Sequence, residues 1–235
     1  MAKPEIYVSV DIEADGPIPG INSMLNVGMA AFRLDQGDPL VPIDTFEVNL
    51  KPLPEAEQDP DTMDFWAKNP EAWNYVTSNT VSAEEGMRKA GGWAANLPGK
   101  PVMVVYPTYD FMWMRWYLVR FCPDQARVFG FQALDIKTLA MAAMNHPTFK
   151  GISKRSMSKF DPDWFKGQPD HDHTGLADAI GQGMLFVRIL QALRGSAADV
   201  AALEAWVEGK AYRQPMNAKS SLTSRVQERL RRTLG

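Results

Sequence analysis

Hydrophobic and polar positions divide the first half of the chain into short β-branched runs. Residues 5–11 have the composition of a β-strand, and residues 24–34 and 45–50 show the same pattern after turn-rich segments. Residues 102–106 form a short, fully apolar run, which is typical of a strand in the middle of a sheet. Residues 128–131 indicate a weaker strand. The pattern predicts a β-meander followed by strands that are separated by helices.

Two helices are expected around the strand at 102–106. Ser82 and Glu85 form a capping-box sequence that opens a helix at 82–96, and a Pro-Gly pair soon after ends it. The run at 111–121 is apolar on nearly all sides, which places it inside the domain.

The second half of the chain predicts two further helices and a long loop. Asp135 is a suitable cap for a helix at 135–144, and a long apolar helix is expected at 174–193. Between them, residues 146–169 are expected to form a long loop studded with lysine. Strands first, and then strands alternating with helices, predict an α/β fold with a central mixed sheet flanked by helices.

A Gly-Ser pair at 195–196 marks the expected domain boundary, so that residues 1–195 form the main domain and 196–235 a helical, basic extension. Helices are predicted at 197–209 and 221–234, the second with leucine and valine at fourfold spacing. One reading packs that apolar stripe onto the core or onto a second subunit, which would make a homodimer. The alternative is a basic arm that follows a phosphate backbone.

Composition is consistent with a soluble, cytoplasmic protein of ordinary globular character. The chain has 235 residues, a net charge of −3 and one cysteine, which rules out an internal disulfide. No apolar run approaches the length of a membrane span, so we expect no membrane association. From residue 210 onward seven basic residues face one acidic residue, so the tail carries +6 and the rest −9 of the total of −3. The overall negative charge therefore does not exclude nucleic-acid contact.

Candidate chemistry enters with acidic residues at spaced positions. Asp11 and Glu13 are two apart in the first expected strand, so their side chains point to the same face. Carboxylates this close either share protons or bind a metal ion. Asp110 and Asp178 come from distant segments, and a third and fourth acid would favour a pair of hard divalent cations. Taken singly, these residues have ordinary readings, such as a solvated strand end for Asp11 or a helix N-cap for Asp110.

The order of these residues carries a resemblance to a known family. An Asp-x-Glu pair, a later Asp and a His-x4-Asp motif that begins at His173 resemble the DEDDh exonucleases of the ribonuclease H-like superfamily, over roughly residues 5–190. Residues 25–28 (LNVG) and 134–138 (LDIKT) are similar to further family motifs, and 62–66 (TMDFW) to a segment of the phage-type and mycobacterial-type branch. The chain departs from the family after Glu13 and before Asp110, where its residues differ from the usual ones.

The resemblance implies a ribonuclease H-like fold with a five-stranded sheet and a metal-dependent 3′-to-5′ exonuclease that acts on single-stranded DNA or RNA. It implies two Mg²⁺ or Mn²⁺ ions, with Asp11 bridging both, Glu13 and Asp178 on the nucleophile side and Asp110 at the second ion. His173 would be the general base, as its titration near neutrality allows. His171 is the competing histidine, and the His-x4-Asp spacing favours His173.

Stacking on the terminal base is expected from aromatic residues near the acids, although each could instead belong to the core. The candidates are Phe65, Trp66, Tyr109 and Trp113, with Trp66 favoured because it lies in an expected loop region within the family-like segment. Two other functions stay open at this point: a ribonuclease H-like binding module without turnover, and a phosphohydrolase for small nucleotides.

Overall fold

A computed structural model describes residues 3–207 of the chain. The chain divides into two compact units, residues 1–189 and residues 190–235. The first unit contains the sheet and the site. Of the second, the structure describes only the continuation of one helix, to residue 207.

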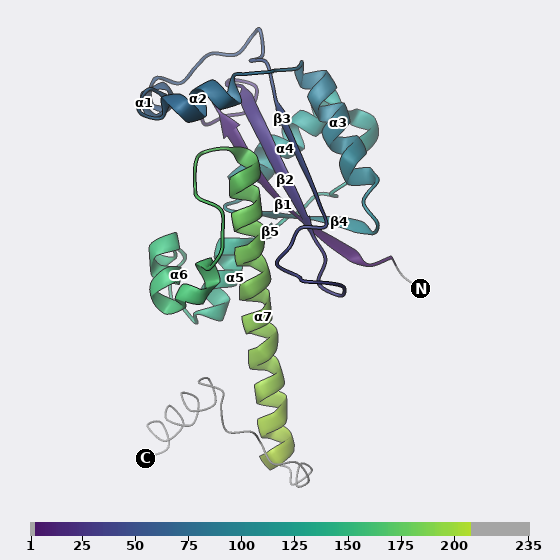
Figure 1. Ribbon diagram of the computed structural model, residues 1–235, viewed down its shortest axis with the longest axis vertical. Helices are drawn as coiled ribbons and strands as arrows, with labels where there is room; N and C mark the ends of the chain where they lie inside the picture. Colours follow the sequence, from purple (N-terminus) through teal and green to yellow (C-terminus); the bar gives the residue numbers. More distant parts are fainter. Residues whose placement is uncertain (1–2, 208–235) are drawn as a thin grey trace. The chain divides into compact units, whose positions relative to one another are not determined.

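Five strands form one mixed sheet in the order β3-β2-β1-β4-β5 (Figure 1). The strands are β1 (Glu5–Ala14), β2 (Met24–Phe32), β3 (Asp44–Asn49), β4 (Lys100–Val105) and β5 (Leu134–Asp135). Strands β1, β2 and β3 pair antiparallel as a meander, whereas β4 pairs parallel to β1, and β5 parallel to β4. The predicted mixed sheet is therefore confirmed, with β1 in its centre.

Seven α-helices surround the sheet in the described part of the chain. They are α1 (Pro60–Lys68), α2 (Pro70–Val76), α3 (Ala83–Ala95), α4 (Tyr109–Phe121), α5 (Ile136–Ala143), α6 (Lys154–Phe160) and α7 (Gly175–Val207). Ser82 caps α3 and Asp135 caps α5 through side-chain hydrogen bonds, as their positions predicted.

The alternation of β1 assigns its two faces to different layers. Val8 and Val10 belong to the main hydrophobic core, together with buried side chains of α3 and α4 such as Met87 and Trp113. On the opposite face, the ring of Tyr7 packs on Phe186 of α7 at 5.1 Å between centroids. Because side chains alternate along a strand, the odd-numbered residues of β1, which include both of its acids, face α7.

Two sequence-based expectations are wrong in the middle of the chain. Residues 128–131 form turns instead of a strand, with Gly130 at φ +72°, a left-handed conformation that suits glycine. The fifth strand is instead Leu134–Asp135. The segment 146–169 is no structureless loop, because Ser153 and Ser156 form a reciprocal capping box that starts α6.

Helix α7 is longer than expected and continues through the predicted boundary at 195–196. The predicted helix at 197–209 is its continuation as far as residue 207, and the one at 221–234 lies outside the described residues. The division into domains at that boundary stays a prediction.

One stretch of α7 also corrects the statement about apolar runs. Among the described residues, Gly175–Gly195 is long and apolar enough to cross a membrane, by length and composition alone. Half of that window is buried inside the protein, as in the core helix of many soluble proteins. The expected lack of membrane association stays a prediction.

Candidate active site

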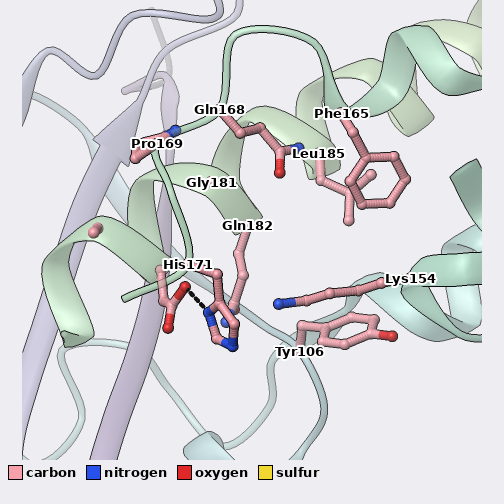
Figure 2. A pocket seen from close by; sticks show the side chains of 11 residues that line it. Tyr106, Lys154, Phe165, Gln168, Pro169, His171, Gly181, Gln182 and Leu185 are labelled. Carbon is pink, nitrogen blue, oxygen red and sulfur yellow. Dashed lines mark hydrogen bonds and ion pairs between the residues drawn. The ribbon is translucent and has the colours of Figure 1, made fainter. Parts of the chain in front are cut away.

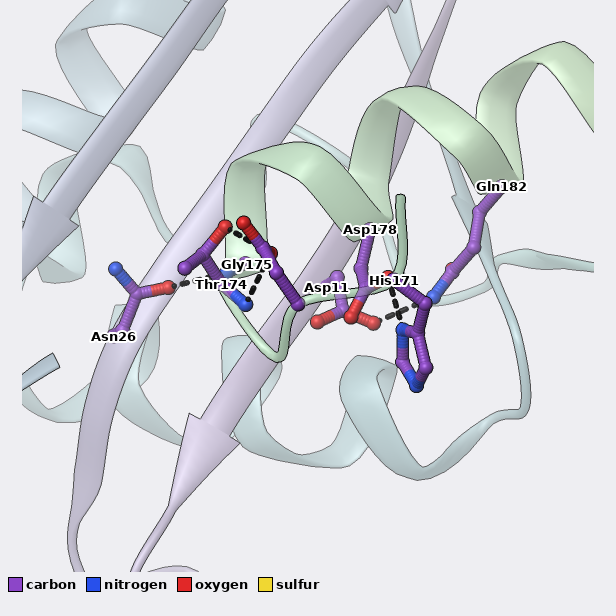
Figure 3. Close-up of polar contacts among 8 residues, drawn as sticks. Asp11, Asn26, His171, Thr174, Gly175, Asp178 and Gln182 are labelled. Atoms are coloured by element: carbon purple, nitrogen blue, oxygen red, sulfur yellow. Dashed lines mark hydrogen bonds and ion pairs between the residues drawn. The ribbon is translucent and has the colours of Figure 1, made fainter. Parts of the chain in front are cut away.

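Three carboxylates from distant parts of the chain meet on the α7 face of the sheet. Oxygens of Asp11, Glu13 and Asp178 lie within 4.8 Å of one another, although Asp178 is 165 residues distant from Glu13 in the sequence. Asp11 and Asp178 are buried, and Glu13 is partly buried. Figure 3 shows Asp11 of the sheet beside Asp178 of α7. The predicted meeting of Asp11, Glu13 and Asp178 is thus present in the structure.

Close backbone contact between β2 and the start of α7 brings Asp178 to this place. A Cβ atom at Gly28 would lie 2.0 Å from the carbonyl carbon of Gly175, so glycine is needed for the helix to approach the sheet. The backbone N–H of Gly175 donates a hydrogen bond of 3.0 Å to the side-chain oxygen of Asn26. Helix α7 therefore begins against the sheet, and Asp178 lies in its first turn.

Asp110 approaches the same group from α4. It lies in the first turn of the helix, whose N-cap is Thr108, so the N-cap reading of Asp110 is wrong by two residues. The side chain is buried, and its Oδ2 has no hydrogen-bond partner in the described part of the chain. Burial raises the pKa of Asp110 well above its usual range, and the charge of Asp11 adds to the effect. A buried carboxylate with an unpartnered oxygen is suited to a cation.

The pKa values of Asp11 and Glu13 are raised as well, which also suits a cation site. Burial raises the pKa of Asp11 well above its usual range, followed by repulsion from Asp178, whereas a hydrogen bond from Gln182 opposes the change. Burial likewise raises the pKa of Glu13, and the charges of Asp11, Asp178 and Asp110 raise it further. Such a set is unfavourable when ionised and alone, and its hard oxygen donors are those that Mg²⁺ and Mn²⁺ prefer. The residues therefore fit divalent metal binding.

Two histidines lie beside the acids, just before α7. His171 Nδ1 makes a short hydrogen bond with Asp178 Oδ1, and the two histidine rings are 4.4 Å apart between centroids. His173 has φ +59°, and its ring meets Phe65 edge-on at 5.0 Å. Burial lowers the pKa of His173, and the charge of His171 lowers it further, so His173 is disposed to stay neutral. The competing histidine, His171, is thus bonded to Asp178 of the carboxylate cluster, and the role of His173 as base stays a prediction.

The aromatic candidates divide into buried and accessible rings. Trp66 is 2% exposed, lies in α1 and donates from Nε1 to the backbone oxygen of Ala14 at 2.9 Å. Trp113 is fully buried in the core. Neither ring has a face free for a base, so stacking by Trp66 or Trp113 is corrected to a structural role. Phe65, 37% exposed, and the partly buried Tyr109 remain candidates.

Sequence reasoning missed Gln182 entirely. Its Nε2 donates a short hydrogen bond to Oδ1 of Asp11, and the side chain is 6% exposed (Figure 3). Gln182 follows Asp178 by four residues, so both lie on the same face of α7. That spacing is the signal by which it could have been found.

A scan of protein-family models finds no match to the chain. Among curated proteins, the chain is 28% identical over 187 residues to the 3′-5′ DNA exonuclease Cap18 of Escherichia coli, a match that covers 77% of this chain and 90% of the relative.

Several solved structures have a similar fold. S. pombe Pop2p in its Mg²⁺- and Mn²⁺-bound form gives a TM-score of 0.57 at 14% identity, covering 80% of this chain and 82% of its own. The nuclease domain of 3′hExo, a DEDDh family member bound to rAMP, gives a TM-score of 0.53 at 11% identity. The match covers 79% of this chain and 92% of that one. The zinc-bound E. coli ExoI–ssDNA complex gives 0.60 at 12%, covering 84% of this chain and 43% of that one.

The chain has a ribonuclease H-like fold, and its carboxylate cluster forms a site suited to divalent metal ions. The order of its acidic motifs resembles that of the DEDDh exonucleases, and its curated relative is a 3′-5′ DNA exonuclease. The finer assignment to the phage-type or mycobacterial-type branch stays a prediction.

Proposed function

We propose that the enzyme releases nucleoside 5′-monophosphates from the 3′ end of single-stranded DNA by a two-metal mechanism. The carboxylates of Asp11, Glu13 and Asp178 within 4.8 Å are the observation that carries this proposal. The name of the Cap18 relative supports DNA, and the ExoI complex supports a single strand. RNA stays the alternative substrate, since the choice depends on how a pocket treats the 2′-hydroxyl.

The four acids would divide the metal ligation as the family resemblance implies. Asp11 interacts electrostatically with both Asp178 and Asp110, which supports its proposed bridging position. Glu13 and Asp178 would hold the ion on the nucleophile side, and Asp110 would reach the second ion. Bound cations would supply an activated water and charge stabilisation at the phosphate.

The remaining residues move a proton and orient the acids. A neutral His173 accepts the proton of the attacking water, in keeping with its lowered pKa. His171 orients Asp178 through their hydrogen bond, and Gln182 does the same for Asp11. Phe65 and Tyr109 are proposed to contact the terminal nucleotide.

Degradation of 5′-labelled DNA and RNA oligonucleotides of equal sequence, side by side with Mg²⁺ and with Mn²⁺, tests the proposal. We expect a ladder that shortens from the 3′ end, faster for DNA, and 5′-monophosphate products. Asp11→Asn should abolish the ladder, whereas Asp124→Asn, a matched change at an exposed aspartate, should not. Faster loss of RNA would reverse the substrate assignment.

A small-nucleotide phosphohydrolase is distinguished by chain length. The exonuclease should cleave oligomers at least as fast as dinucleotides, because a longer strand makes more contacts. A preference for dinucleotides would favour the other class. Cytoplasmic location and a homodimer through the C-terminal extension stay predictions.

A further inference from the structure

A pocket lies beside the carboxylate cluster, between α7, the start of α6 and the end of β4 (Figure 2). Its polar lining comes from four separate segments, namely Tyr106, Lys154, Gln168, His171, Asp178 and Gln182. Because Asp178 belongs both to the pocket and to the carboxylate cluster, the two spaces adjoin.

Gln182 presents an unpartnered acceptor in the wall of this pocket. Its Nε2 is occupied by Asp11, whereas its Oε1 is buried and has no hydrogen-bond partner among the described residues. Buried polar atoms nearly always have a partner, so an orphan in the wall of a pocket points to a donor that arrives or moves when a ligand binds.

Lys154 supplies such a donor. It is the first residue of α6, and the capping box of Ser153 and Ser156 fixes the backbone there. Figure 2 shows its ammonium group directed into the pocket toward Gln182 and His171. Within the described part of the chain, no carboxylate lies within 4.0 Å of that ammonium group.

The charge of Lys154 matters because the pocket contains Asp178 and adjoins the acidic cluster of Asp11 and Glu13. A polyanionic strand approaching Asp11 and Asp178 meets repulsion until cations are present. Among the side chains that line the pocket, Lys154 alone carries a permanent positive charge. A lysine ammonium is a compact charge with three donors, so it can hold a phosphate oxygen and a side-chain carbonyl at once.

We propose that Lys154 and Gln182 form a phosphate subsite, in which the ammonium group binds a non-bridging oxygen of a backbone phosphate upstream of the scissile one. The Oε1 atom of Gln182 accepts a second hydrogen bond from the same ammonium group, and Gln182 thereby links the subsite to Asp11. This inference rests on the proposed exonuclease function. It identifies the contact that would hold the strand upstream of its last nucleotide.

The experiment combines a charge-neutralising substitution with neutral phosphates. Lys154→Met is compared with Lys159→Met, a matched change at an exposed lysine near the other end of α6. Each enzyme is given single-stranded DNA with one methylphosphonate linkage at the second or the third position from the 3′ end. Initial rates give kcat/KM, and melting temperatures confirm that both variants are folded.

A direct contact predicts non-additive losses. In the wild type, one of the two neutral linkages should lower kcat/KM roughly 10-fold or more, as expected for a hydrogen bond to a charged group. In Lys154→Met the unmodified strand should show that loss, and the same linkage should add nothing further. Lys159→Met should behave as the wild type. The slope of log kcat/KM against log salt should fall by about 0.7 for the lost contact.

Additive losses at both linkages, or an unchanged salt slope, would overturn the subsite while leaving the exonuclease function intact. Failure of the wild type to degrade any strand would instead overturn the proposed function. In that case, fluorescence anisotropy would measure binding of the same oligonucleotides, and the binding losses would decide the subsite. A wild type that also fails to bind them would overturn both the subsite and the exonuclease function.

Discussion

At the scale of single residues, Asp11 combines two properties that are unfavourable in the absence of metal. It is buried on the sheet, and it lies close to Asp178, so both effects raise its pKa. A carboxylate whose folded pKa is raised stabilises the protein only while protonated, and that contribution is lost as pH rises through the folded pKa. The metal-free protein therefore loses stability as pH rises above the ordinary carboxylate range of about 4.

We accordingly predict that Asp11→Asn removes activity and yet raises the melting temperature in metal-free buffer at neutral pH. A gain of about 1 kcal/mol corresponds to roughly 2–4 °C in a domain of this size. The difference in melting temperature should vanish at low pH, because the variant and the wild type are then both uncharged at position 11. Calorimetry in EDTA, from acid to neutral pH, measures both melting temperatures. A variant that melts below the wild type at every pH would contradict this prediction.

The two histidines lead to a second residue-level prediction. If His173 is the base, His173→Ala should lower kcat by roughly 10²- to 10⁴-fold with little change in substrate affinity. Its defect should shrink at high pH, where hydroxide replaces the assisted water. His171→Ala should lose only the orientation of Asp178 and be far less damaging. Pre-steady-state rates across pH separate the two, and a larger loss in His171→Ala would transfer the base to that residue.

The residues that could be predicted are those for which a local rule suffices. Asp11 and Glu13 meet because strand side chains repeat every two residues, which is visible in the sequence. Trp66 could not be assigned, because only the tertiary structure brings its indole to the carbonyl of Ala14. The spacing of Gln182 from Asp178 places both on one face of α7, but only the folded structure brings its partner Asp11 opposite it.

At the scale of elements, polar side chains of the sheet take the place of a conventional cap for α7. Asn26 accepts from the N–H of Gly175, and its amide donates to Asn49 at 2.6 Å and to Glu47 at 3.2 Å. These bonds satisfy a donor at the helix start that would otherwise lack a partner. The same first turn carries Asp178, so the attachment of the helix also places a proposed metal ligand.

Gly28→Ala tests this coupling of helix placement to chemistry. Its methyl group would collide with Gly175, and relief requires the start of α7 to move. We expect a loss of about 1–3 kcal/mol in the free energy of unfolding, as in other overpacked sites, together with lower activity. Gly92→Ala is the control, because its nearest neighbours are 4.0 Å from the added atom. Urea denaturation and initial rates are measured together, and full activity in a destabilised Gly28→Ala would refute the coupling.

Elements were predictable in proportion to their length and local signals. The nine-residue β2 and the capped α3 follow from apolar runs and Ser82. Strand β5 has two residues, which is too short for any periodicity, and it exists because β4 pairs with it. Helix α6, with seven residues, is likewise too short to be distinguished from a loop.

At the scale of the whole molecule, the net charge conceals a local concentration of negative charge at the site. The chain carries −3 overall, but three acids from β1 and α7 lie within 4.8 Å of one another, and the charge of Asp110 from α4 acts on two of them. These like charges repel one another in the folded protein, whereas the unfolded chain keeps the same acids apart. Metal binding should therefore favour the folded state selectively.

Addition of Mn²⁺ or Mg²⁺ should raise the melting temperature of the wild type. A ligand that binds only the native state stabilises it by about 2.7 kcal/mol at 100 times its Kd, which is a shift of several degrees. Asp11→Asn and Glu13→Gln should lose most of the shift, because each removes a carboxylate of the cluster. Asp124→Asn, at an exposed position, should keep it. An equal shift in all four proteins would mean that the ions bind elsewhere, and no shift at millimolar metal would deprive the acid cluster of its proposed role.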